Sequence, residues 1–208
     1  MNEWEVTLFF KAVQHATSVA RAYINRGSTD FFEAVFDELQ RIKLMVTGKP
    51  IALQAFVPGV NLLVMNADMD GAAAMGVCRS VIKHNVPDYS KIPNDTPPEK
   101  IAPWFMKICW RHGKEPVHGF RALVSTEDHA ILMDFVYINS EEGLAKFSAF
   151  VKGLGVRKII DWWTHKEINT WIIPCLVKSQ SLIPAAIWDG FGVAVGSSTA
   201  RPAAAINV

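Results

Sequence analysis

Apolar and polar side chains alternate along the first 24 residues in two short stretches. The alternating apolar positions of the first stretch are Trp4, Val6, Leu8, Phe10 and Ala12. Val19, Arg21 and Tyr23 continue the same period after a polar break at 14–18. The same letters also permit helical spacing, but their β-branched and aromatic content favours a two-stranded hairpin. Hairpin and helix both stay open for residues 1–25.

The next segment has the spacing of an amphipathic helix. Its apolar positions are Phe32, Val35, Phe36, Leu39 and Ile42. Asp30 is the predicted N-cap, and Glu33 stands three residues later, as in a capping box. Gly48 and Pro50 are the predicted end of this helix.

An α/β unit follows. A short strand is predicted over 51–57, and the continuous apolar run over 62–65 is typical of a strand that is buried on both faces. The acidic sequence Asn-Ala-Asp-Met-Asp ends this second strand. A helix over 72–82, rich in small residues, comes directly after it.

The rest of the chain reads as a loop, one buried element and several helices. The proline-rich segment 87–103 predicts an exposed loop, and 104–110 predicts a strand or a buried helix. Helical patterns begin at Pro116, with Ser125 or Thr126 and then Ser140 as predicted caps. The tail 189–208 is rich in Gly, Ala, Ser and Thr, so we expect it to be loosely ordered.

Composition narrows the class of protein. The 208 residues carry 21 Lys and Arg against 20 Asp and Glu, a net charge of +1, which excludes a globally basic nucleic-acid binder. Half of the residues are hydrophobic, enough for a core. Three cysteines do not make a disulfide framework, which favours a reducing, intracellular setting. We expect no membrane span and no signal peptide.

Asp68 and Asp70 are the strongest candidates for catalysis. Both follow a buried strand, at the edge where α/β folds place their sites. Carboxylates there are suitable ligands for Mg²⁺, which orients and activates phosphoryl groups. The structural alternative is that Asp70 simply caps the following helix.

Cys109 and His112 form a C-x2-H pair, and His118 is nearby in the sequence. Thiolate and imidazole are zinc ligands, but a structural zinc site needs four ligands and the remaining Cys and His residues are scattered. The alternative is a buried cysteine beside a hydrogen-bonded histidine.

Trp162, Trp163 and Trp171 lie close together in the sequence, and Arg157, Lys158, His165 and Lys166 are interleaved with them. Exposed aromatic rings among cations bind nucleic acids. We nevertheless favour a core position for these rings, since large aromatic residues are mostly buried.

The sequence as a whole resembles the Mutator-like DDE transposases of fungal genomes. The resemblance covers about residues 4–188 and depends on three runs, NLLVMNADMDGAAAMGVCRSVI, KICWRHGKEPV and DWWTHKEINTWIIPCLVKSQS. It implies an α/β fold with an incomplete RNase H-like mixed sheet, flanking helices and a mostly helical C-terminal insertion. The implied units are a partial core at 1–115, a helical Trp-rich insertion at 116–188 and a flexible tail at 189–208.

By resemblance, Asp68 is the second catalytic acid and a Mg²⁺ ligand, Asp70 accompanies it, and Cys109 and His112 are the family's C-x2-H pair. The hairpin would be the second and third strands of the sheet. The family's first Asp lies on a strand before this chain begins, and its final Glu should follow the insertion, whereas the last Glu here is Glu167. We therefore expect a catalytically inactive remnant that retains weak DNA or protein binding, with nuclear location implied by resemblance alone.

The resemblance has one structural consequence, and the sequence leaves two alternative functions open. By resemblance, the central first strand is missing, so two strand edges lose their partners. The chain can rearrange, pair with another chain or fold poorly, and we expect low stability or self-association. One alternative is a Mg²⁺-dependent phosphatase-like hydrolase that uses Asp68 as nucleophile and Asp70 as acid/base, since LLVMNADMDG resembles the motif of haloacid dehalogenase-type hydrolases. The other is a zinc-stabilised interaction module around Cys109 and His112.

Overall fold

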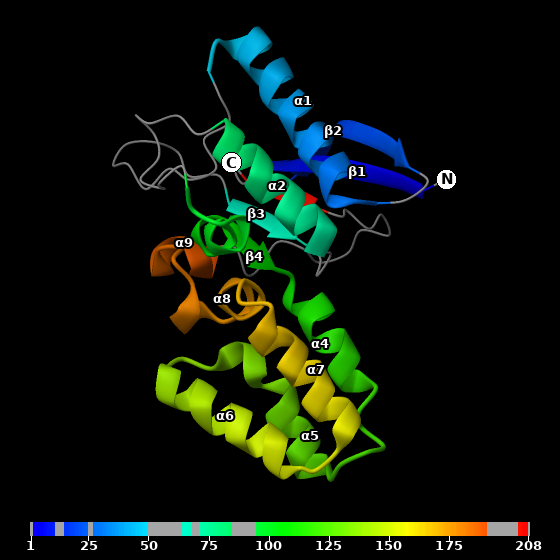
Figure 1. Cartoon of the computed structure of the whole chain (residues 1–208), viewed down its shortest axis with the longest axis vertical. Coiled ribbons are helices and arrows are strands. Elements are labelled where there is room, and N and C mark those ends of the chain that lie inside the picture. The colour runs from blue at the N-terminus through cyan, green and yellow to red at the C-terminus, as the bar shows by residue number, and fades with distance from the viewer. Residues whose placement is uncertain are drawn as a thin grey trace.

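The computed structural model describes residues 2–10, 15–24, 27–49, 64–67, 71–84, 95–190 and 204–207. They form a mixed α/β structure in which a sheet and two helices lie at one end and a helical unit lies at the other (Figure 1). The strands are β1 Asn2–Phe10, β2 His15–Ile24, β3 Val64–Ala67, β4 Met106–Ile108 and β5 Ala204–Asn207. The longer helices are α1 Thr29–Thr47, α2 Gly71–Lys83, α4 Trp110–His118, α5 Thr126–Met133, α6 Glu141–Gly153 and α7 Arg157–Ile168. The short ones are α3 Pro98–Ile101, η1 Ala102–Trp104, η2 Phe135–Tyr137, α8 Ile172–Leu176, η3 Lys178–Gln180 and α9 Ala185–Gly190.

The sheet has the strand order β2-β1-β5-β3-β4. β1 and β2 are antiparallel, and β3 and β4 are parallel, with α2, α3 and η1 between them in the chain. β5 lies in the middle, parallel to β1 and antiparallel to β3. β5 comes from the C-terminal end of the chain and lies between the hairpin β1–β2 and the parallel pair β3–β4.

The N-terminal hairpin is confirmed. β1 pairs with β2 from Asn2 opposite Ile24 to Phe10 opposite His15, with an irregularity between Val6 and Thr7. Such a bulge bends a strand and strengthens its twist. The alternating pattern therefore predicted this segment correctly, and the helix that the same residues permit does not form.

Helix α1 begins two residues earlier than its pattern predicts. Ser28, not Asp30, is the N-cap, and its Oγ accepts a hydrogen bond from the backbone N–H of Phe31 at 3.2 Å. Asp30 lies within the first turn, where its carboxylate suits the helix dipole and pairs with Arg79 of α2 at 3.0 Å. The predicted end is confirmed, because Gly48 adopts the left-handed conformation at φ 65°.

In the middle of the chain, one predicted element is confirmed and one predicted loop is wrong in its described part. The helix expected over 72–82 is α2. The strand expected over 51–57 and the first two residues of the run 62–65 lie outside the described residues. The segment 87–103 was predicted to be all loop, but its described part forms α3 and η1. Pro98 and Pro103 sit in their first turns, where proline needs no N–H partner and its fixed φ suits a helix.

From residue 106 onward, the structure tests the predicted strand or helix, the predicted helix caps and the predicted tail. Residues 106–108 form β4, buried on both faces, so the strand interpretation of 104–110 is correct. Ser125 caps α5 and Ser140 caps α6, as predicted, through hydrogen bonds from the N–H groups of Asp128 and Gly143. Helix α4 begins at Trp110, so the expected boundary between 115 and 116 falls inside a helix. The tail was predicted to lack regular structure, yet 204–207 is a strand, because neighbouring strands supply its partners.

Candidate functional site

The site expected at the carboxyl end of β3 lies where the sheet meets the helical unit. β3 ends at Ala67, and α2 begins at Gly71. Asp68 and Asp70 lie outside the described residues, so their predicted roles as catalytic acids and Mg²⁺ ligands stay predictions. The structure does describe what faces the start of α2. A Cβ placed on Gly71 would lie 3.9 Å from the indole ring of Trp171, in the turn between α7 and α8.

The tryptophans singled out in the sequence belong mainly to the core, as favoured. Trp163 is 1% exposed and Trp171 5%. Trp162 is partly buried against the same core. Phe135 packs edge-on against Trp162 and Trp163, with ring centroids 5.4 and 6.3 Å apart. This arrangement leaves Trp163 and Trp171 without the exposed face that a stacking platform needs.

An exposed aromatic residue that the sequence analysis missed does have a cation against it. Tyr137 is 57% exposed, and Lys114 Nζ lies 4.3 Å from the centre of its ring. Tyr137 packs edge-on against Trp110 at 5.1 Å, and the Trp110 indole N–H donates to the carbonyl of Leu176 at 3.0 Å. The contact with Trp110 therefore fixes the position of the exposed Tyr137 ring. No sequence signal marked it, because Lys114 and Tyr137 are far apart in the chain.

Lys107 is a second residue that the sequence analysis did not select, although it interrupts an apolar run. It lies on β4 and is 6% exposed. Its Nζ donates to the carbonyl of Trp188 at 3.1 Å and lies 4.7 Å from the Trp188 ring and 5.0 Å from the Trp110 ring. Burial lowers the pKa of Lys107, against a smaller opposite effect from Asp189. These contacts anchor α9 to the sheet, so we assign Lys107 a structural role.

Cys109 and His112 are both partly buried at the start of α4. Cys109 is the N-cap position and His112 lies in the first turn. Among the described residues, no group of three or more His, Cys, Asp or Glu side chains could hold a metal ion. The pair therefore gains no further ligand from the described part of the chain, and zinc binding stays a prediction.

The other two cysteines are buried in the core. Burial raises the pKa of the thiols of Cys78 and Cys175 above the usual range. A buried, protonated thiol is a poor nucleophile and a poor metal ligand. Cys78 and Cys175 therefore offer no reactive group.

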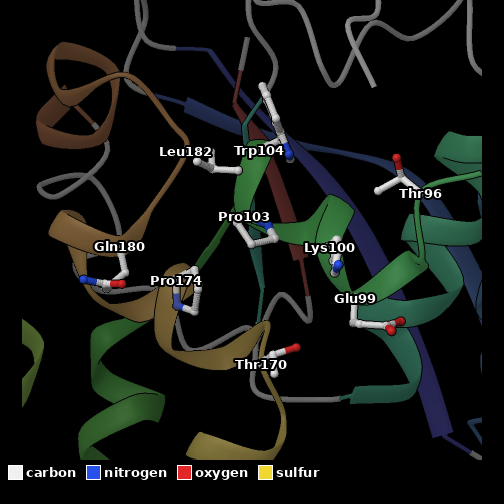
Figure 2. Close-up of a pocket in the computed structure, with 9 residues that line it drawn as sticks. All are labelled: Thr96, Glu99, Lys100, Pro103, Trp104, Thr170, Pro174, Gln180 and Leu182. Atoms are coloured by element: carbon white, nitrogen blue, oxygen red, sulfur yellow. The ribbon is translucent and has the colours of Figure 1, made fainter. Parts of the chain in front are cut away.

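A pocket opens between the segment 96–104 and the segment 170–182 (Figure 2). Its volume is about 450 Å³, within the range of sites for small organic ligands, roughly 300–1,000 Å³. Its apolar walls come from Pro103, Trp104, Pro174 and Leu182. Hydrogen bonds hold the two segments together, since the Leu182 N–H and the Ser181 hydroxyl both donate to the Pro103 carbonyl, at 3.1 and 3.4 Å.

Comparison with protein-family models, with curated proteins and with solved structures finds no match for this chain. In the described part of the chain, no helix combines the length and the apolar character needed to cross a membrane. In any fold, function is decided by the residues of the site rather than by the fold itself.

Proposed function

We propose that this chain is a DNA-binding protein derived from a Mutator-like DDE transposase, with no phosphoryl-transfer activity of its own. In this proposal the sheet is an altered RNase H-like core. β1 and β2 correspond to its second and third strands, and β3 and β4 correspond to the parallel pair joined by a crossover helix. α4 to α8 correspond to the helical insertion.

One observation carries the proposal. The start of α2, at the carboxyl end of β3, lies directly against Trp171 of the helical unit. Parallel strands joined through a helix place their functional groups at this edge. A helical unit that covers the edge would form one wall of a surface for the nucleic acid. Tyr137 and Lys114, on the same helical unit, supply an exposed ring and a cation of the kind that contact single-stranded bases and phosphates.

The proposed lack of catalysis depends on charge. A two-metal site needs several carboxylates to hold its ions. Within these 208 residues, Asp68 and Asp70 follow β3, and no Glu follows Glu167. Glu167 itself accepts hydrogen bonds from Ser148 and from the Trp163 indole inside the helical unit, so it is committed to the packing there. We therefore derive no metal-dependent step from this chain.

Binding to a fluorescently labelled forked DNA, measured by anisotropy at several salt concentrations, tests the proposal. We expect weak binding whose affinity falls as salt rises, because phosphate contacts release counterions. Tyr137→Ala combined with Lys114→Glu should reduce affinity by about tenfold, since stacking on one aromatic ring and one charge contact are lost. Lys146→Glu is the matched control, because Lys146 is an exposed lysine on α6 whose partner is Glu142 at 2.6 Å.

A nicking assay on supercoiled plasmid with Mg²⁺ or Mn²⁺ tests the proposed lack of phosphoryl-transfer activity. We expect no metal-dependent nicking above background. Nicking that disappears in Asp68→Asn would show that the chain is an active nuclease. Binding that does not depend on salt, or undetectable binding to every DNA tested, would instead show that the proposed DNA binding is wrong.

A further inference from the structure

We infer that the pocket between η1 and α8 takes a single unstacked nucleobase of the bound DNA, with Lys100 at its mouth for an adjacent phosphate. The inference rests on the proposed function and gives it a ligand.

The walls suit a flat ring. The lining includes the flat indole ring of Trp104, the rigid apolar rings of Pro103 and Pro174, and the side chain of Leu182 (Figure 2). Every nucleobase has a π-face that stacks on such surfaces without regard to sequence. A volume of about 450 Å³ admits a base together with its sugar, and it is too small for a folded segment of protein.

The rim suits the edge of a base better than a purely aliphatic ligand. Three residues with polar side chains, Thr96, Thr170 and Gln180, line the same pocket. The Nε2 atom of Gln180 is buried, and among the described residues it has no hydrogen-bond partner. Buried polar groups without partners are costly, so a ligand edge with donors and acceptors is favoured over one without them.

The charges at the rim argue for one phosphate and against a polyanion. Glu99 and Lys100 are both exposed and both line the pocket, so their charges oppose each other there. In the described part of the chain, Lys100 has no ion pair, which leaves its ammonium available for a phosphodiester. The Glu99 carboxylate can accept a hydrogen bond from a base N–H, as carboxylates do from cytosine N4. We therefore expect bases with an edge N–H₂ group to bind better than thymine.

The position of the pocket links it to the candidate site. Thr170 lines the pocket, and the next residue, Trp171, is the one that faces Gly71 at the start of α2. A base held in the pocket would therefore hold its strand beside the carboxyl end of β3. An unpaired base enters such a pocket more readily than a paired one, because extrusion from a duplex costs stacking and pairing.

The test uses 2-aminopurine, a fluorescent base whose emission falls when it stacks on another ring. The full chain is titrated with a duplex that contains one unpaired 2-aminopurine and with the fully paired duplex of the same sequence. We expect about tenfold tighter binding to the unpaired form, together with quenching. Trp104→Ala should abolish the preference.

A second variant guards against loss of folding. Thr170→Trp places a bulky ring at the pocket mouth from an exposed position and removes nothing from the core. It should abolish the preference and the quenching without changing the melting temperature. Thr126→Trp, at the exposed start of α5 and outside the pocket, is the matched control and should change neither.

The free 5′-monophosphate of 2-aminopurine deoxyriboside separates the two proposals. If duplexes bind but the unpaired base confers no preference, or Thr170→Trp leaves the preference intact, the pocket inference is wrong and the proposed function stands. If no DNA binds but the free nucleotide is quenched in a way that Thr170→Trp removes, the pocket is a nucleotide site and the proposed function is wrong. If neither binds, both are wrong.

Discussion

Gly76 is the residue on which the packing of α1 against α2 depends most directly. A Cβ at this position would lie 2.6 Å from the Cβ of Phe32 and 2.7 Å from the backbone N of Glu33 and the carbonyl of Thr29. Such distances are far below van der Waals contact, and two of the three atoms belong to the backbone of α1. The glycine therefore sets how closely the two helices approach. Asp37 reinforces this contact by accepting hydrogen bonds from Ser80 and Lys83 of α2.

Gly76→Ala should lower the free energy of unfolding by about 1–3 kcal/mol, because the two helices must move apart to admit the methyl group. Gly153→Ala is the control, since a Cβ there meets nothing within 4 Å and alanine favours a helix. The control should be neutral or stabilising by up to about 1 kcal/mol. Urea unfolding of the three proteins measures both values. An equal response of the two variants would show that α1 and α2 are not in this close contact.

At the scale of elements, helix α7 places a lysine side chain in the hydrophobic core. Lys166 is 1% exposed, and its Nζ lies 4.6 Å from the centre of the Trp162 ring. Burial lowers the pKa of Lys166 to about 8. An ordinary lysine titrates near pH 10.4, so between about pH 8 and pH 10 the unfolded chain binds more protons than the folded one. The free energy of unfolding should therefore rise with pH across this window, and the burial cost should be constant below pH 8.

Lys166→Met should remove that rise and stabilise the protein by about 1–3 kcal/mol at pH 7, because an apolar side chain of similar size replaces a buried charge. Denaturant unfolding at pH 7, 8, 9 and 10 measures the effect. Lys146→Met, in an exposed pair with Glu142, should change stability by less than about 0.5 kcal/mol at each pH. Destabilisation by Lys166→Met at pH 7 would mean that the contact with Trp162 outweighs the cost of burial.

At the scale of the whole molecule, β5 joins the two halves of the sheet. It pairs with β1 through 204–207 on one side and with β3 on the other. In the described residues, no direct pairing links β1 to β3. Removal of β5 would thus expose two strand edges, and such edges pair readily with other chains.

Truncation after residue 203 should therefore increase the self-association of the chain and lower its melting temperature. Size-exclusion chromatography with light scattering, over a range of protein concentrations, measures the first effect. Truncation of Val208 alone is the control, because it leaves all four residues of β5 in place. A truncated chain that associates no more than the full chain, with an unchanged melt, would show that β5 does not support the sheet.

Much of the local structure could be predicted because its causes are local. The hairpin followed from alternation, α2 from small residues after a strand, and α5 and α6 from their serine caps, which bind the nearest N–H groups. The start of α1 was missed because Ser28 and Asp30 both have capping side chains, and only the backbone conformation shows which one accepts the Phe31 N–H. The burial of Trp163 and Trp171 was also predictable from size and hydrophobicity.

The sequence by itself determined the order of most elements, the apolar faces and the candidate acids, since each depends on residues a few positions apart. Only the tertiary structure decided which segments that are distant in the sequence contact one another. It paired Tyr137 with Lys114, closed the pocket between Pro103 and Leu182, and set Trp171 against Gly71. It also gave 204–207 a place in the sheet, although alanine and asparagine, three of its four residues, have little strand preference of their own. The physical reason is common to all four, because contacts between distant segments depend on which surfaces are left to be covered once local elements have formed.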